Sequence, residues 1–146
     1  MLKLEPLKEK NKDEFIQDEY LQDIVERNLE VAAQACIDIA NRIISLQELE
    51  KPQDYYGAII RLGEEGILPD KFARKFAPIA GLRNILIHEY IDIDWEEIYK
   101  NLLGIEQFYK FMNYIKKWLL QKSSPVSQSI KFDRPIGRLA DCLIVF

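Results

Sequence analysis

The sequence predicts an all-α protein, an antiparallel helical bundle of four to five helices. In residues 18–49, apolar side chains recur every three or four positions, and neither glycine nor proline interrupts them. This is the spacing of one helix face. A second stripe of the same spacing runs through residues 95–121. The length of 146 residues and the apolar share of 48% fit one globular domain with its own core.

Charge and composition limit the classes of function that the chain can have. The formal net charge is −4, so any RNA site must be a local basic patch rather than a whole basic surface. The two cysteines, Cys36 and Cys142, form neither a disulfide framework nor a metal pattern, and Cys36 lies in an apolar helical run that predicts a buried, inert thiol. We expect no metal and no cofactor. The sequence has no signal peptide and no apolar span long enough for a membrane, which predicts a cytoplasmic protein.

The chain divides at about residue 120. Residues 1–120 are expected to form one helical domain, and residues 121–146 a C-terminal tail of unknown structure. The tail begins with a serine-rich linker and ends in an apolar stretch, residues 136–146. A disordered tail is favoured, and docking of the apolar stretch on the bundle is the alternative.

Two shorter helices are expected between the long ones. Pro52 suits the first turn of a helix over residues 53–64, and Gly66 suits the left-handed residue that follows a helix end. A helix over residues 70–88 follows. Pro78 removes a backbone donor inside it, so we expect a kink near Ala77. The basic side chains of this helix form either a solvated face or a track for an RNA backbone: Lys71, Arg74, Lys75 and Arg83.

The last helix, residues 95–121, is preceded by Asp94 and Glu97 in the spacing of a capping box. Its aromatic side chains are expected to pack in the core, and Gly104 is expected to mark a close approach between helices. The 18–49 helix carries three polar residues in or beside its apolar stripe: Arg27, Asn28 and Asp38. They are expected to hydrogen-bond across helices, with support of a functional site by Arg27 or Asn28 as the alternative.

Residues 81–90 gather the chemically versatile side chains, among them His88, the single histidine of the chain. An arginine can hold a phosphate through two hydrogen bonds, and an imidazole can exchange protons near neutral pH. Arg83 and His88 are five residues apart, roughly 140° around an ideal helix. They meet at one target only if the helix frays near His88 or if two chains share the site. The plainer alternatives are a capping or surface histidine and a packing role for Tyr90.

The order Arg83, Asn84, His88, Tyr90 resembles the Arg-Asn-x-x-x-His-x-Tyr motif of HepT-like toxins in the HEPN superfamily of ribonucleases. The resemblance extends from about residue 15 to residue 120. Three further segments resemble the family in the same order: residues 18–29, 35–41 and 62–69. Residues 1–17 resemble the family's first helix only in a shortened form, which predicts exposed apolar surface.

The resemblance implies a homodimer in which Arg and His of both chains line one cleft and cleave RNA without a metal. The 2′-hydroxyl would attack the adjacent phosphate. By the same resemblance, Arg83 and His88 would be catalytic, holding the phosphate and handling protons, and Asn84 would orient the histidine or the backbone.

The resemblance also implies a toxin of a type VII-like toxin–antitoxin system. Its antitoxin, a minimal nucleotidyltransferase, would neutralise it by transferring AMP to Tyr90. The competing class is a non-catalytic HEPN module that binds a nucleotide or docks on a nucleotidyltransferase.

Overall fold

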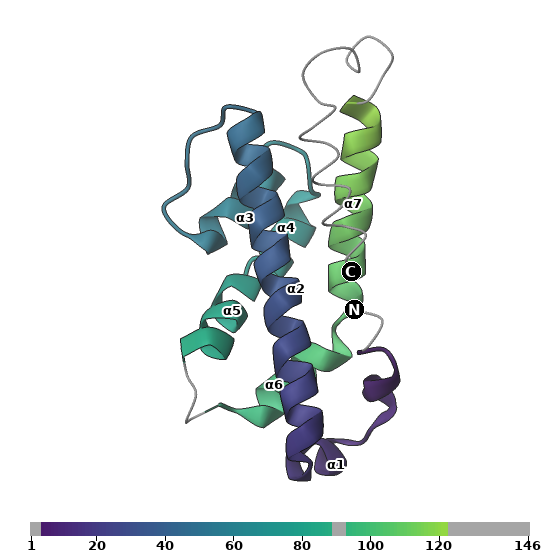
Figure 1. Cartoon of the computed structure of the whole chain (residues 1–146). Helices are drawn as coiled ribbons and strands as arrows, with labels where there is room; N and C mark the ends of the chain where they lie inside the picture. The colour runs from purple at the N-terminus through teal and green to yellow at the C-terminus, as the bar shows by residue number, and fades with distance from the viewer. Residues whose placement is uncertain (1–3, 89–92, 123–146) are drawn as a thin grey trace.

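The computed structural model describes residues 4–88 and 93–122, and every regular element in these two ranges is helical (Figure 1). A short 3-10 helix, η1, spans Pro6–Glu9. Seven α-helices follow in order: α1 Lys12–Gln17, α2 Glu19–Leu46, α3 Tyr55–Glu64, α4 Asp70–Phe76, α5 Ile79–His88, α6 Trp95–Leu103 and α7 Glu106–Lys122. The expectation of an all-helical bundle is confirmed.

Helix α2 is the central element, and it packs against α1, α3, α5, α6 and α7 (Figure 1). The Asp18 carboxylate caps it by accepting hydrogen bonds from the backbone N–H groups of Tyr20 and Leu21. One face of α2 is fully buried, as its periodicity predicts. Cys36 lies on this face, so the prediction of a buried cysteine is confirmed, and burial raises the pKa of its thiol well above the usual range.

Helices α3 and α4 meet at a tight corner. The Asp54 carboxylate caps α3 by accepting a hydrogen bond from Gly57 N–H at 2.6 Å, so the helix begins at Tyr55 rather than at residue 53. Gly66 has φ 74°, as predicted for a residue after a helix end. The two helices touch at Gly63, where an added Cβ would lie 2.6 Å from the Cβ of Ala73.

The helix predicted over residues 70–88 is two helices, and in this respect the prediction is wrong. α4 ends at Phe76 and α5 begins at Ile79. Pro78 lies between them, and its missing N–H produces a complete break where a kink was expected. Its carbonyl instead accepts hydrogen bonds from Gly81 and Leu82, which start the first turn of α5.

The helix predicted over residues 95–121 is also broken, at Gly104. The N–H of Gly104 donates to the carbonyls of Lys100 and Asn101 and closes α6. An added Cβ on Gly104 would meet only these two carbonyl oxygens, at 3.6 and 3.7 Å. The expectation that Gly104 marks a close approach between helices is therefore wrong, and the residue ends a helix instead.

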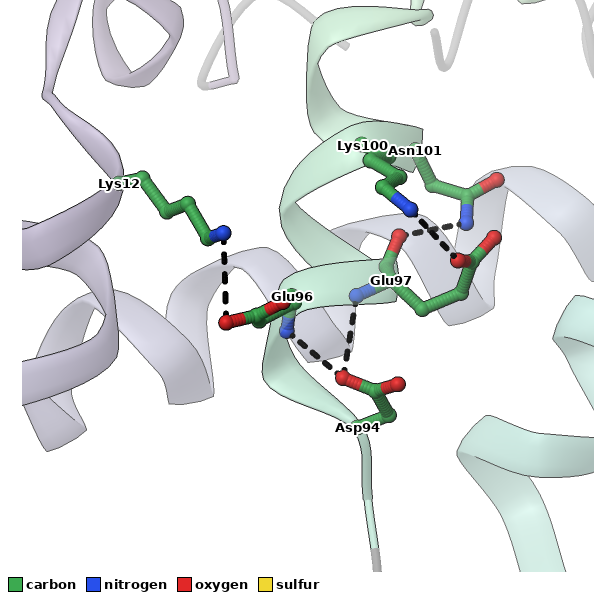
Figure 2. A network of polar contacts seen from close by, with 6 residues as sticks. All are labelled: Lys12, Asp94, Glu96, Glu97, Lys100 and Asn101. Carbon is green, nitrogen blue, oxygen red and sulfur yellow. Dashed lines mark hydrogen bonds and ion pairs between the residues drawn. The ribbon is translucent and has the colours of Figure 1, made fainter.

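The N-terminal region closes one end of the core. Leu4 and Phe15 are fully buried, and the Gln22 amide donates to the carbonyls of Phe15 and Ile16. Lys12 of α1 forms an ion pair with Glu96 of α6, with 3.2 Å between Nζ and Oε1 (Figure 2).

Figure 2 also shows the Asp94 half of the capping box predicted for α6, whereas the contact described for the Glu97 carboxylate is with Lys100. The Asp94 carboxylate accepts hydrogen bonds from the backbone N–H groups of Glu96 and Glu97 at 3.0 and 3.3 Å. Glu97 lies 3.6 Å from Lys100, and its carbonyl accepts a hydrogen bond from the Asn101 amide. The Asp94 cap fixes where α6 begins, and the Lys12–Glu96 ion pair joins this end of α6 to α1.

The aromatic side chains of α4 and α7 pack together in the core, as predicted for α7. Phe76 stacks on Phe111 at a centroid distance of 5.1 Å and meets Phe108 edge-on at 5.7 Å. Phe72 contacts Tyr114. Large apolar side chains also remain exposed: Tyr20, Ile24, Val31, Leu103 and Leu120, with Tyr55 and Tyr56 on α3. None of the helices described is long and apolar enough to cross a membrane.

Candidate active site

Helix α5 carries three of the four motif side chains. Arg83 is half-buried, whereas Asn84 and His88 are exposed. His88 is the last residue of α5. Tyr90 lies outside the described residues, as do Cys142 and the tail beyond residue 122.

Arg83 is fixed from helix α2. Its Nε donates a hydrogen bond of 2.7 Å to Oε1 of Gln34. The Gln34 amide nitrogen donates in turn to the Asp38 carboxylate at 2.9 Å. Only this orientation of the amide gives each neighbour a matching partner, because a guanidinium can only donate and a carboxylate can only accept. The Gln34 side chain is therefore held at both ends, and it holds the guanidinium.

Helix α3 supports the same guanidinium. The Arg83 Cζ lies 5.1 Å from the centroid of the Tyr55 ring, within the range of a cation–π contact. Tyr55 is the first residue of α3, next to the Asp54 cap that sets where the helix begins. Three helices thus position one guanidinium. Gln34 and Tyr55 are both residues that the sequence analysis did not select.

Asn84 lies beside the arginine. Its Oδ1 accepts a hydrogen bond of 3.1 Å from Nη1 of Arg83. The contact described for this amide is therefore with the arginine, whereas the resemblance implied a contact with the histidine or the backbone. Gln34 and Asn84 use two of the five N–H donors of Arg83 in the contacts described, which leaves three for a ligand.

His88 is not brought to Arg83 by fraying, because α5 stays helical through His88. Five residues along a helix still separate the two side chains by roughly 140°. Of the two routes by which they could meet at one target, the one left is a site shared between two chains.

Three polar residues of α2 were expected to bond across helices, and the contacts described for them stay within α2: Arg27, Asn28 and Asp38. Arg27 lies 3.5 Å from Glu30, and the Asn28 amide donates to the carbonyl of Ile24 at 2.7 Å. The hydrogen bonds described for Arg27, Asn28 and Asp38 all stay within α2, so the expectation of cross-helix bonds is wrong. Asp38 still reaches the site through Gln34.

The basic side chains do not form one row with Arg83. Lys71, Arg74 and Lys75 are exposed on α4, and Arg74 pairs with Asp70 at 3.1 Å. Arg83 lies beyond the break at Pro78 and is half-buried. No group of three or more His, Cys, Asp and Glu side chains in residues 4–88 and 93–122 is arranged to hold a metal ion.

Comparison with known proteins identifies the family. Residues 2–115 match the family described as Ribonuclease HepT-like. The chain is 34% identical over 109 residues to the tRNA nuclease HepT of Aphanizomenon flos-aquae, covering 74% of each protein. It is 33% identical over 104 residues to the mRNA nuclease HepT of Shewanella oneidensis, covering 70% of this chain and 78% of that relative.

A solved structure shares the fold. It is that of a tri-AMPylated Shewanella oneidensis HEPN toxin in complex with an MNT antitoxin, with a TM-score of 0.68 and 30% identity. The similarity covers 76% of this chain and 84% of that toxin. The helical bundle is thus HEPN-like, and the chain belongs to the HepT-like family of ribonucleases.

Proposed function

We propose that this protein is the toxin of a toxin–antitoxin pair, an endoribonuclease that uses Arg83 and His88 as its catalytic residues. The observation that carries this proposal is the fixed guanidinium. Gln34 holds Arg83 at 2.7 Å, Tyr55 lies beneath it, and most of its donors remain for a phosphate.

The chemistry follows from these two groups. The 2′-hydroxyl of a nucleotide attacks the neighbouring phosphorus and forms a new O–P bond, while the bond to the 5′-oxygen breaks. His88 exchanges the protons of this step, because an imidazole can take one from the attacking hydroxyl or give one to the leaving oxygen. Arg83 stabilises the charge that develops on the phosphate oxygens. The products carry a cyclic phosphate and a 5′-hydroxyl.

A homodimer would bring the Arg83 guanidinium and the His88 imidazole to one site. Tyr20, Ile24 and Val31 are exposed on α2 to 83%, 43% and 41%. At 100° per residue they project within roughly 40–80° of Gln34, so they form an apolar stripe, interrupted by the exposed Arg27, next to the side chain that holds Arg83. We propose that two chains pair through this stripe and that Arg83 of one chain and His88 of the other then share one site.

The partner is proposed from the relatives. The similar HEPN toxin is AMPylated and bound to an MNT antitoxin. By analogy, a minimal nucleotidyltransferase would transfer AMP to Tyr90 of this chain, in the cytoplasm. Each AMP adds a negative phosphate two residues beyond His88, where it would compete with RNA for Arg83.

A non-catalytic module remains the second candidate, because binding a phosphate and cleaving at a phosphate use the same residues. The test is cleavage of RNA by the purified chain in excess chelator, followed by analysis of the new ends. Cleavage that leaves cyclic phosphates supports the nuclease. Tight binding of RNA or nucleotide without cleavage would favour the docking module.

A further inference from the structure

A groove opens beside Arg83, between the start of α3 and the first turns of α5. Its lining combines aromatic rings, amides and one glycine: Gln53, Asp54, Tyr55, Tyr56, Ala80, Gly81 and Asn84. Tyr55 and Tyr56 are exposed to 38% and 47%. Both rings therefore keep part of their surface available next to the groove.

The fold does not require a glycine at position 81. Its φ is not in the left-handed region, and a Cβ added to it would meet nothing within 4 Å. Gly63, by contrast, is required by the 2.6 Å approach of Ala73. A glycine in a helix is less favourable than an alanine. Because Gly81 has no side chain, it leaves space in the groove that a larger residue would fill.

We propose that this groove is a nucleobase subsite, in which a base of single-stranded RNA stacks on Tyr56 above Gly81 while the adjoining phosphate binds Arg83. The proposal rests on the proposed ribonuclease function and extends it. Exposed aromatic rings next to a cation are the usual components of single-strand binding, since rings stack on bases and the cation holds the backbone. The Asn84 amide, already bonded to Arg83, lines the groove where it can also meet the edge of a base.

The charge of the groove fits a base better than a second phosphate. Asp54 is the charged side chain in its lining, and its carboxylate is occupied by the N–H of Gly57. A phosphate would be repelled by this carboxylate, whereas a neutral base would not. Arg83 therefore takes the phosphate, and the groove takes the base attached to it.

The test uses the full chain carrying His88→Ala, so that RNA is bound without being cut, and a short single-stranded RNA containing a fluorescent purine analogue. Stacking of the analogue quenches its fluorescence. Tyr56→Ala is expected to weaken RNA binding by roughly tenfold or more and to reduce the quenching. Tyr56→Phe keeps the ring and should recover most of both losses. Tyr55 is not a suitable test position, because its ring also supports Arg83.

Gly81 gives a second, independent arm. Gly81→Ala and Gly81→Leu are expected to fold at least as stably as the parent, with equal or higher melting temperatures, while RNA affinity falls from Gly to Ala to Leu. Asn113→Ala is the control, because Asn113 is exposed on α7 away from the groove, and its replacement should leave RNA affinity unchanged.

The outcomes separate the proposals. If the chain with His88 intact cuts RNA but the Tyr56 and Gly81 variants bind and quench like the parent, the subsite is wrong and the ribonuclease stands. These variants could also lose RNA affinity because they no longer dimerise, which light scattering would show. In that case the groove is a protein interface and the subsite is wrong. If the chain with His88 intact neither binds nor cuts RNA, both proposals fall.

Discussion

Gln34 and Arg83 are 49 residues apart in the sequence and are joined by a hydrogen bond of 2.7 Å. This contact links the central helix to the helix that carries the motif. Because Asp38 holds the other end of the Gln34 amide, the guanidinium is fixed before any RNA arrives. Catalytic groups that are fixed in advance need no reorganisation when charge develops. Gln34 is thus expected to act through Arg83 as a positioning residue.

Replacing Gln34 tests this role. Gln34→Ala removes a hydrogen bond to a charged group, worth about 1.5–3 kcal/mol, and should lower kcat/KM for RNA cleavage by roughly ten- to a hundredfold. The loss should fall mainly on kcat, because a loose guanidinium still attracts RNA. Gln121→Ala, an exposed glutamine on α7, serves as the control and should retain full activity. A Gln34→Ala protein with unchanged kcat would show that the contact has no catalytic role.

The dimer is tested at Val31. Val31→Glu places a charge on the apolar stripe next to Gln34, and burying an unpaired charge in an interface is unfavourable by several kcal/mol. We expect light scattering to report a monomer and RNA cleavage to be lost together. Leu120→Glu changes a more exposed residue, 75% against 41%, at the far end of α7 and should stay dimeric. An active Val31→Glu monomer would contradict the shared site.

AMP transfer is tested at Tyr90. When the chain is co-expressed with its nucleotidyltransferase partner, the intact mass should rise by whole AMP units, and cleavage should fall as negative phosphate accumulates beside Arg83. Tyr90→Phe lacks the acceptor hydroxyl, so it should gain no mass and remain toxic. An equal gain of mass in both proteins would place the modification at another residue.

Gly63 lies where two helices pack together and Gly104 lies at the end of a helix, so replacing each by alanine should affect stability differently. Gly63→Ala should lower the free energy of unfolding by about 1–3 kcal/mol, because the new methyl overlaps with Ala73 where α3 and α4 touch. The methyl added by Gly104→Ala makes only ordinary contacts, so this change should alter the free energy of unfolding by less than Gly63→Ala does. Urea unfolding monitored by circular dichroism compares the two. Equal midpoints would mean that α3 and α4 do not approach as closely as described.

The sequence predicted the longest helix well, whereas the helices predicted over residues 70–88 and 95–121 are each two helices in the structure. An uninterrupted stripe in residues 18–49 became α2, Glu19–Leu46, and Asp94 capped α6 as its spacing indicated. The break at Gly104 was missed because the apolar spacing continues across it. Leu102 and Ile105 are three residues apart and both fully buried, so periodicity alone cannot reveal that the helix ends between them.

The site was only half predictable. Arg83, Asn84 and His88 stand close together in the sequence, so a motif could select them. Gln34 and Tyr55 come from other helices, and nothing local marks them. Their importance depends on which face of α2 and which end of α3 lie against α5, and this is set by the packing of the whole bundle.

We expect His88 to drive RNA cleavage in a site that Arg83 shares, and the His88→Ala protein tests this most directly. The measurement is the rate of RNA cleavage in excess chelator, with helical content and oligomeric state checked in parallel. We expect a folded dimer that still binds RNA and shows no cleavage above background. Cleavage at the wild-type rate by the folded His88→Ala protein would contradict it.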